Sequence, residues 1–380
     1  MSARVTPKQA WETMRELPHL RRIRQGDLEP GHWLTAEPGD ASGGWGSWGI
    51  KATPSKRGLT LMNLIEAGDP PPPDEGYATQ QIRGASMDRQ WPLFPMTYSA
   101  NKRYQVWADN VMALYEESVS RQWSATKDIP WERLTPLPKD LERALCMICT
   151  HFTRVEFLAA DHLGEWLAKI GYAYHEVKMF LGAQIMDETR HLEVFRKRAF
   201  ANGGGMGSSM QPKMDTAARL GLMPDQTSIR ADYNKNSYAV QFIDEGIVLD
   251  LFRFSEFLCQ TEVDKIMFQR IMQDEARHVS YGAMRLKFYL EHCPDREEET
   301  ERLHALADTL EVSHAVSILL NPDTMEPSAV LAGGGVSGMD KGYEAYRQLY
   351  VRVREEYLRR CDTVGFSRRD RCLLPSEPPF

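Results

Sequence analysis

The sequence lacks the features that would indicate a membrane, secreted or nucleic-acid-binding protein. No run of about 18 apolar residues occurs, so no transmembrane helix is expected. The first residues, MSARVTPKQAWETM, contain no apolar stretch of the kind that a secretory signal requires. The 46 basic residues are outnumbered by 53 acidic ones and form no cluster that could follow a phosphate backbone. We therefore expect a cytoplasmic protein that binds neither membrane nor nucleic acid.

Cysteine is scarce as well. The six cysteines are spread over 380 residues, which excludes a dense disulfide framework. Cys146 and Cys149 form a C-x-x-C pair that could be redox-active or half of a zinc site. They lie in an apolar helical pattern with no second cysteine pair nearby, so we interpret both as buried core residues.

Alternation typical of β-strands is also absent, and the fold class expected is all-α. Residues 1–98 are rich in glycine, proline and tryptophan, as in GDASGGWGSWG (39–49) and GDPPPPDEG (68–76). This composition predicts an irregular N-terminal arm packed on the helical part, because glycine and proline interrupt helices.

Helical periodicity dominates the rest of the chain. Residues 99–292 are expected to form the main bundle, with a connection at ANGGGMGSSMQP (201–212). Residues 293–380 are expected to form a C-terminal helical extension. Its predicted helices span about 297–320 and 340–360, on either side of the glycine-rich AGGGVSG.

Two pentapeptides in the predicted bundle are near-copies, Asp187-Glu188-Thr189-Arg190-His191 and Asp274-Glu275-Ala276-Arg277-His278. In each, a glutamate and a histidine are three residues apart and share one helix face, so both can reach a single ion. One E-x-x-H is common by chance. Two copies with the same flanking aspartate and arginine indicate a shared function.

Both motifs lie on apolar faces. Repeated steps of three or four positions from Glu188 reach Leu181, Ile185 and Phe195, which form one apolar stripe. An unpaired carboxylate on such a buried face costs several kcal/mol, so a bound cation is the natural compensation.

A dimetal bundle requires one more glutamate from each of two further helices, at the height of the motifs. Glu156 satisfies this for the first motif, since Tyr172 lies midway between Glu156 and Glu188, in the probable turn sequence IGYAYH. Residues at equal distance from a hairpin turn lie at one level.

For the second motif, Thr261 followed by Asp264 resembles a helix start, which puts the turn near Gln260. Glu245 and Glu275 are equidistant from Gln260, and we assign Glu245 as the ligand. Glu256 and Glu262 are the rival carboxylates, but both lie too close to the turn.

The expected catalytic and metal-binding set is Glu156, Glu188, His191, Glu245, Glu275 and His278. Four carboxylates balance two divalent cations, and mixed oxygen and nitrogen ligands suit iron, with manganese at one or both positions as the alternative. Spacing does not exclude zinc. Dioxygen is the expected co-substrate.

These residues resemble those of the ferritin-like di-iron carboxylate proteins, over about residues 140–292. The doubled D-E-x-R-H is most similar to the hydroxylase subunits of bacterial multicomponent monooxygenases and their relatives, which include the ribonucleotide reductase small subunit. The resemblance implies a ferritin-like four-helix bundle with extra helices. It also implies that Asp187 holds His278 and Asp274 holds His191, while Arg190 and Arg277 neutralise this second layer.

Some positions depart from the relatives. A radical-storing reductase subunit would carry tyrosine where this chain has Phe195, which disfavours a tyrosyl radical. Arylamine N-oxygenases would carry a further histidine where this chain has Ile271.

Several other side chains are candidates for a substrate pocket. The set comprises Phe152, Gln184, Phe195, Gln241 and Ile271. The two glutamines are polar where the pattern calls for apolar residues, which favours contact with substrate or water. By contrast, we interpret His151, His162 and His175 as structural or surface residues.

The function expected is a non-haem di-iron oxygenase or oxidase that activates O2 and hydroxylates, N-oxygenates or desaturates a small organic substrate. It would need an external electron donor or reductase, and a homodimer is compatible with it. The alternatives are an iron-storage or peroxide-scavenging protein, a radical-generating reductase-like subunit, and a metal-free partner subunit. The long N-terminal arm and C-terminal helices favour the first reading over storage.

Overall fold

The computed structural model describes residues 5–27, 49–84, 95–207 and 225–380. Its first unit comprises Met1–Leu59, Asn63–Pro70 and Ile82–Pro92, and its second comprises Thr60–Met62, Pro71–Gln81 and Leu93–Phe380. The helices before residue 99 are α1 (Pro7–Arg15), α2 (Pro18–Arg24) and α4 (Leu61–Ala67). Most of the glycine-rich segment 39–49 and the end of 201–212 lie outside the described residues. All six predicted metal ligands lie in the second unit.

Every regular element in the described part of the chain is helical, and β-pairing there is limited to isolated bridges. The predicted all-α class is confirmed. Among the described residues no single helix is both long and apolar enough to cross a membrane. One bent pair, Arg296–Leu319 with Pro322–Gly333, meets that requirement only when its two helices are taken together.

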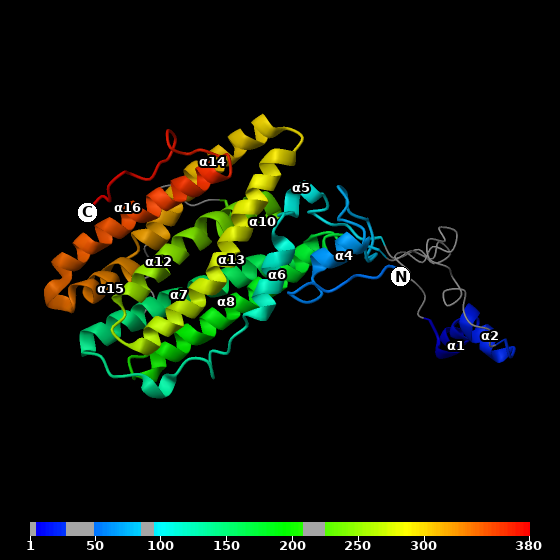
Figure 1. The fold of residues 1–380 in the computed structure, drawn as a ribbon, viewed down its shortest axis with the longest axis horizontal. Helices are drawn as coiled ribbons and strands as arrows, with labels where there is room; N and C mark the ends of the chain where they lie inside the picture. Colours follow the sequence, from blue (N-terminus) through cyan, green and yellow to red (C-terminus); the bar gives the residue numbers. More distant parts are fainter. Residues whose placement is uncertain (1–4, 28–48, 85–94, 208–224) are drawn as a thin grey trace. The chain divides into compact units, whose positions relative to one another are not determined.

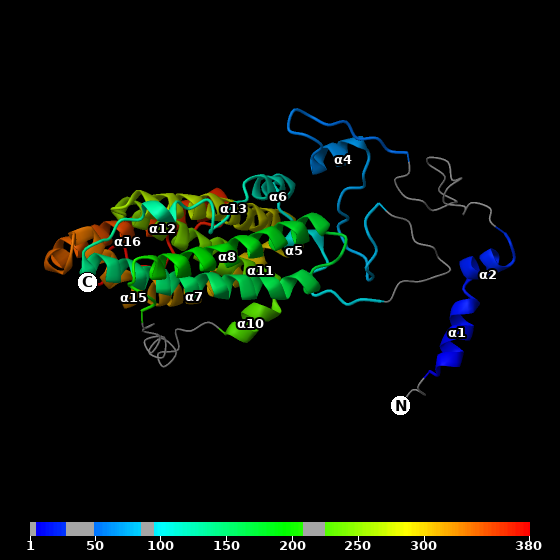
Figure 2. The same cartoon turned by 90° about the horizontal axis from the view of Figure 1, so that it is seen from below.

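Two long helical hairpins form the bundle. The first joins α7 (Lys139–Lys169) to α8 (His175–Ala201), and the second joins α12 (Glu245–Leu258) to α13 (Glu262–His292). Both views show the four helices side by side (Figures 1 and 2). This is the predicted ferritin-like arrangement, with one predicted metal-ligand glutamate or E-x-x-H motif on each helix.

The hairpin turns fall where the sequence predicted them. The first helix pair turns between Lys169 and His175. At the second turn, the Thr261 side chain caps α13 by accepting a hydrogen bond from the Asp264 backbone N–H at 3.1 Å. These turns bring the four glutamates to one height.

A π-helical segment leads into α12. It is η3 (Tyr238–Asp244), and it ends directly before Glu245. Helix α13 approaches this segment so closely that a Cβ on Gly282 would lie 2.1 Å from the Gln241 carbonyl oxygen. Only glycine fits there, and the close approach fixes α12 against α13 beside the site.

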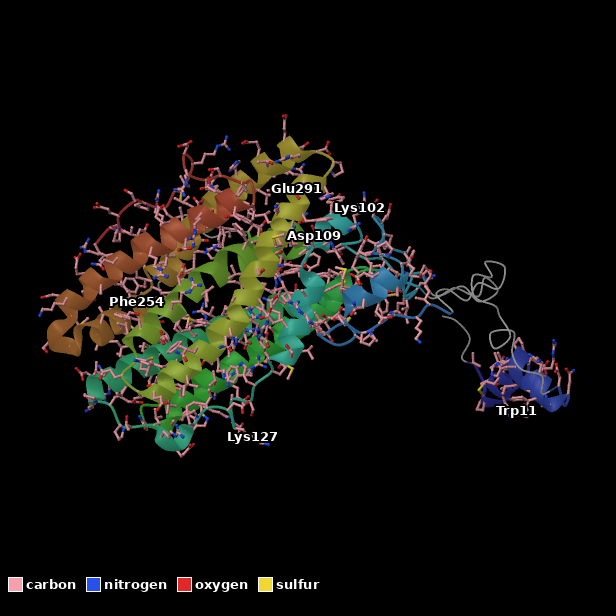
Figure 3. The ribbon with its side chains drawn as sticks, in the orientation of Figure 1. Trp11, Lys102, Asp109, Lys127, Phe254 and Glu291 are labelled. Carbon is pink, nitrogen blue, oxygen red and sulfur yellow. The ribbon has the colours of Figure 1, made fainter. Side chains whose placement is uncertain are left out.

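The C-terminal helices pack on the bundle. They are α14 (Arg296–His314), η4 (Ala315–Leu319), α15 (Pro322–Gly333), η5 (Val336–Gly338) and α16 (Met339–Thr363). Phe254 of α12 lies toward α16 (Figure 3), where its ring centroid is 6.1 Å from that of Tyr346. Helices near 297–320 and 340–360 were predicted, whereas α15 was not. It begins at Pro322 after the capping side chain of Asn321, a typical helix start.

Shorter elements complete the second unit. They are α5 (Arg103–Val106), α6 (Val111–Ser120), η1 (Trp131–Arg133), α10 (Gln226–Ala231) and α11 (Tyr233–Ser237). Cys146 and Cys149 are buried and unpaired in α7, as predicted, and burial raises the pKa of the Cys146 thiol to about 12.

Candidate dimetal centre

The six predicted ligands converge in the middle of the bundle. Their ligand atoms form two overlapping groups, each with all atoms within 4.8 Å of one another. The groups are Glu156, Glu188, His191 and Glu275, and Glu188, Glu245, Glu275 and His278. All six side chains are at most 5% exposed. Glu188 and Glu275 belong to both groups, so they occupy the positions of bridging ligands.

Each imidazole turns one nitrogen toward the glutamates. His191 Nδ1 lies 3.0 Å from Glu275 Oε1 and 3.3 Å from Glu156 Oε2. His278 Nδ1 lies 3.1 Å from Glu188 Oε1 and 3.2 Å from Glu275 Oε2. The two rings are 6.2 Å apart, centroid to centroid. Nδ1 is therefore the nitrogen that faces the space between the carboxylates.

The other nitrogen of each ring meets an aspartate of the opposite motif. His191 Nε2 is 3.1 Å from Asp274 Oδ2, and His278 Nε2 is 3.4 Å from Asp187 Oδ2. This is the crossed pairing that the resemblance implied. An aspartate at Nε2 keeps a proton on that nitrogen and leaves Nδ1 free to bind a metal.

Two arginines surround this aspartate layer. Arg190 and Arg277 each contact both Asp187 and Asp274, at 2.8 Å for Arg190 to Asp274 and 3.1 Å for Arg277 to Asp187. The two arginine charges therefore balance the two aspartate charges, and each aspartate is held by both arginines.

Three side chains that sequence reasoning missed complete the layer. Trp123 Nε1 donates to Asp274 Oδ2 at 2.7 Å, and the Trp123 ring lies beneath the Arg190 guanidinium at 4.8 Å. Ser118 and Gln122 each donate to Asp187 at 3.3 Å. They come from α6 and the segment after it, and no motif in the sequence marked them.

Two of the glutamates hold protons when no metal is bound. Burial raises the pKa of Glu156 well above its usual range, and the charges of Glu275 and Glu188 raise it further. Burial likewise raises the pKa of Glu245, with Glu188 and Glu275 again adding to the effect. Both carboxyl groups therefore hold their protons to a higher pH than an exposed glutamate does.

The other two glutamates remain charged. Although burial opposes ionisation, His278 and hydrogen bonds from both imidazoles hold the pKa of Glu188 well below its usual range. Burial and the charge of Glu188 also oppose ionisation of Glu275, but His278 and a hydrogen bond from Glu245 lower its pKa.

The imidazoles are cationic in this state. Burial alone would lower the pKa of His191, but hydrogen bonds to Asp274 and the glutamates raise it well above its usual range. The pKa of His278 is raised in the same way against burial, mainly by Glu188 and Glu275. Two carboxylates and two imidazoliums make the six-residue cluster electrically neutral.

The donor set fits two divalent metal ions. Glu156 Oε1 is buried and accepts no hydrogen bond within the described chain. Buried carboxylate oxygens without partners are rare and call for a cation. With four ionised glutamates and two neutral imidazoles, two divalent ions would again give a neutral cluster. Mixed carboxylate and imidazole ligands suit iron or manganese.

Gln184 and Gln241, which were predicted to line a pocket, orient the side chain of Glu245. Gln184 Nε2 donates to Glu245 Oε1 at 2.8 Å, and Gln241 Nε2 donates to Gln184 Oε1 at 2.9 Å. Ser237 donates to Gln241 Oε1 at 2.7 Å. This buried chain of hydrogen bonds leaves Glu245 Oε1 with one defined partner.

The three apolar pocket candidates lie in the packed core. Phe152 and Phe195 have ring centroids 5.5 Å apart and are fully buried, as is Ile271. None of the five pocket candidates is among the residues that line the cavity described next.

A cavity of about 160 Å³ reaches the cluster at Glu156, Glu188 and Glu245. Its apolar wall consists of Val155, Leu158, Ala159, Val240, Val248 and Ile318. Its polar wall consists of His151, Arg154, His162, Asp244, Ser313, His314 and Ser317. These residues come from α7, the π-helical segment with α12, and α14 with η4. His151 and His162, which we interpreted from the sequence as structural or surface residues, therefore line the same cavity as three of the predicted metal ligands.

Comparison with known proteins gives a distant structural likeness. No protein-family model and no curated protein matches the chain. A solved structure of an R2-like ligand-binding oxidase from Sulfolobus acidocaldarius is similar, with a TM-score of 0.42 and 15% sequence identity, over 64% of this chain and 90% of that one. Because this similarity is distant, the evidence for the fold and for the site is the geometry described above.

Proposed function

We propose that the protein is a non-haem di-iron oxygenase or oxidase that uses dioxygen to hydroxylate, N-oxygenate or desaturate a small organic molecule. The observation that carries this proposal is the cavity with a largely apolar wall that ends on three of the six ligands. Such a cavity brings a small apolar molecule to the metal site, which a storage protein does not need.

Glu156, Glu188, Glu245, Glu275, His191 and His278 would hold the two ions. When bound, the ions would supply the reduction of dioxygen and the oxidation of the substrate. Asp187 and Asp274 fix the orientation of the imidazoles, and Gln184 fixes that of Glu245. The apolar wall keeps water away from the reacting groups.

The proposed reaction also needs a source of electrons. Reducing dioxygen needs electrons, and the chain's hydrogen-bonding and acid–base groups provide none. We therefore include an external electron donor or reductase as a partner, and a homodimer as the assembly. Manganese at one or both positions is the alternative to iron.

Anaerobic loading with ferrous iron, followed by oxygen, tests the proposal. Metal analysis should find two iron ions per chain, and oxygen uptake should be faster when a small organic substrate and a reductant are present. The Glu188→Gln variant, which lacks a carboxylate that both ligand groups share, is the matched control and should bind less iron. Rapid formation of an iron mineral without substrate would indicate storage and contradict the proposal.

A further inference from the structure

His151 lies in the wall of the cavity and has an unpaired ring nitrogen. The residue is 5% exposed, and its Nε2 atom is buried and has no hydrogen-bond partner in the described part of the chain. His151 lines the same cavity as Glu156 and lies on the same helix, α7. A buried polar atom without a partner is unfavourable, so a ligand group that pairs with it is expected.

Other polar groups in the wall already have partners. His314 Nε2 lies 2.6 Å from Asp244 Oδ1 as an ion pair, and His314 Nδ1 lies 2.7 Å from the Leu310 carbonyl oxygen. Ser313 donates to the same carbonyl oxygen at 3.2 Å. These groups can stay as they are when the cavity fills, whereas His151 gains a bond.

The His151 ring is neutral near pH 7. Burial, together with the positive charge of Arg154, lowers the pKa of His151 to about 4. A neutral imidazole has one nitrogen that donates and one that accepts. A hydroxyl or amino group can pair with Nε2 in either tautomer, because it both donates and accepts.

The size of the cavity limits the rest of the ligand. An engineered cavity of roughly 150 Å³ in another protein takes up benzene, and this one measures about 160 Å³. Its apolar side chains would contact a hydrocarbon body, with one end at the metal ligands.

We propose that His151 is a specificity-determining residue, which selects small uncharged molecules that carry one hydroxyl or amino group on an apolar body. This inference rests on the proposed function, since it assigns a substrate class to the same site. Arg154, which is half-buried in the wall, is the charge that an anionic ligand would seek, so an anionic probe tests the uncharged class.

Calorimetric titration of the iron-loaded full chain without oxygen tests the inference. Phenol, benzene and benzoate serve as probes of one ring size. Phenol should bind roughly tenfold tighter than benzene, because only phenol pairs with Nε2. Benzoate should bind no tighter than phenol. The measurement involves no turnover, so it can fail while oxygen uptake succeeds, or succeed while oxygen uptake fails.

Variants assign the preference to one nitrogen. His151→Leu should reduce the preference for phenol over benzene to below about twofold, and His151→Phe, which keeps a ring in place, should do the same. His162→Leu removes an imidazole from the same wall that already bonds to the Leu158 backbone, and should keep the preference. Equal binding of phenol and benzene, no binding of either, a preference kept in both His151 variants, or tighter binding of benzoate would each overturn the inference.

Discussion

Replacing Glu245 and Glu188 one at a time with glutamine should change the stability of the metal-free protein to very different extents. Burial and neighbouring charges raise the pKa of Glu245, so it is already protonated there, and glutamine is a neutral group of nearly the same shape. Glu245→Gln should therefore change the free energy of unfolding by less than about 1 kcal/mol, since Gln184 can still donate to the amide oxygen.

Glu188→Gln should be much more costly. Glu188 is ionised and faces His278 Nδ1 at 3.1 Å and His191 Nδ1 at 3.7 Å. Removing its charge takes away the carboxylate closest to the buried His278 Nδ1, and breaking a buried pair in this way costs roughly 3–5 kcal/mol. Glu188→Gln should lose about that much stability without metal.

Urea unfolding of the metal-stripped proteins, followed by circular dichroism, measures both values at pH 7. Metal analysis of the same variants after loading should show that both bind less iron than the unmodified chain, since each has lost an anionic ligand. Equal destabilisation by the two substitutions would refute the assigned charge states. Full iron binding by Glu245→Gln would refute its place in the metal site.

Four further predictions concern proton release, the titration of His151, the aspartate layer and helix packing. Loading with two divalent ions should release about four protons per chain near pH 7, two from glutamates and two from imidazoles, which titration calorimetry in buffers of different ionisation enthalpy measures. The folded pKa of His151 is about 4, below the usual 6.5 of an unfolded chain, so its contribution to stability is complete above pH 6.5 and is lost as pH falls toward 4. The loss should amount to about 3 kcal/mol and should be missing in His151→Leu, as pH-dependent urea unfolding would show. Asp187→Asn should weaken metal binding about 10–100-fold in a chelator competition, because His278 loses its anionic partner. Unchanged affinity would show that Asp187 does not support the site. Gly282→Ala should destabilise the protein by about 2–3 kcal/mol in urea unfolding, because its Cβ would meet the Gln241 carbonyl.

The clustering of the four glutamates and two histidines could be predicted from sequence because their pattern is local. The spacing of Glu188 and His191 puts both on one helix face whatever the surrounding fold. The partners Glu156 and Glu245 followed from the symmetry of a hairpin about its turn, and the Thr261 cap supplied the position of the second turn.

Helix α15, by contrast, was not predicted from the sequence. Its segment has no clear amphipathic pattern, because Pro322, Pro327 and several buried polar residues interrupt the apolar stripe. Packing against α7 and α16 stabilises a helix there, as tertiary contacts often override weak local preference.

By itself, the sequence determined the helical class, the doubled motif and the four glutamates, since each depends on residues close together in the chain. Tertiary structure alone decided that Trp123 supports Asp274 and that the cavity opens between α7, α12 and α14. Those contacts join residues that are far apart in the sequence. The periodicity of one helix does not show which face of a distant helix will pack against it.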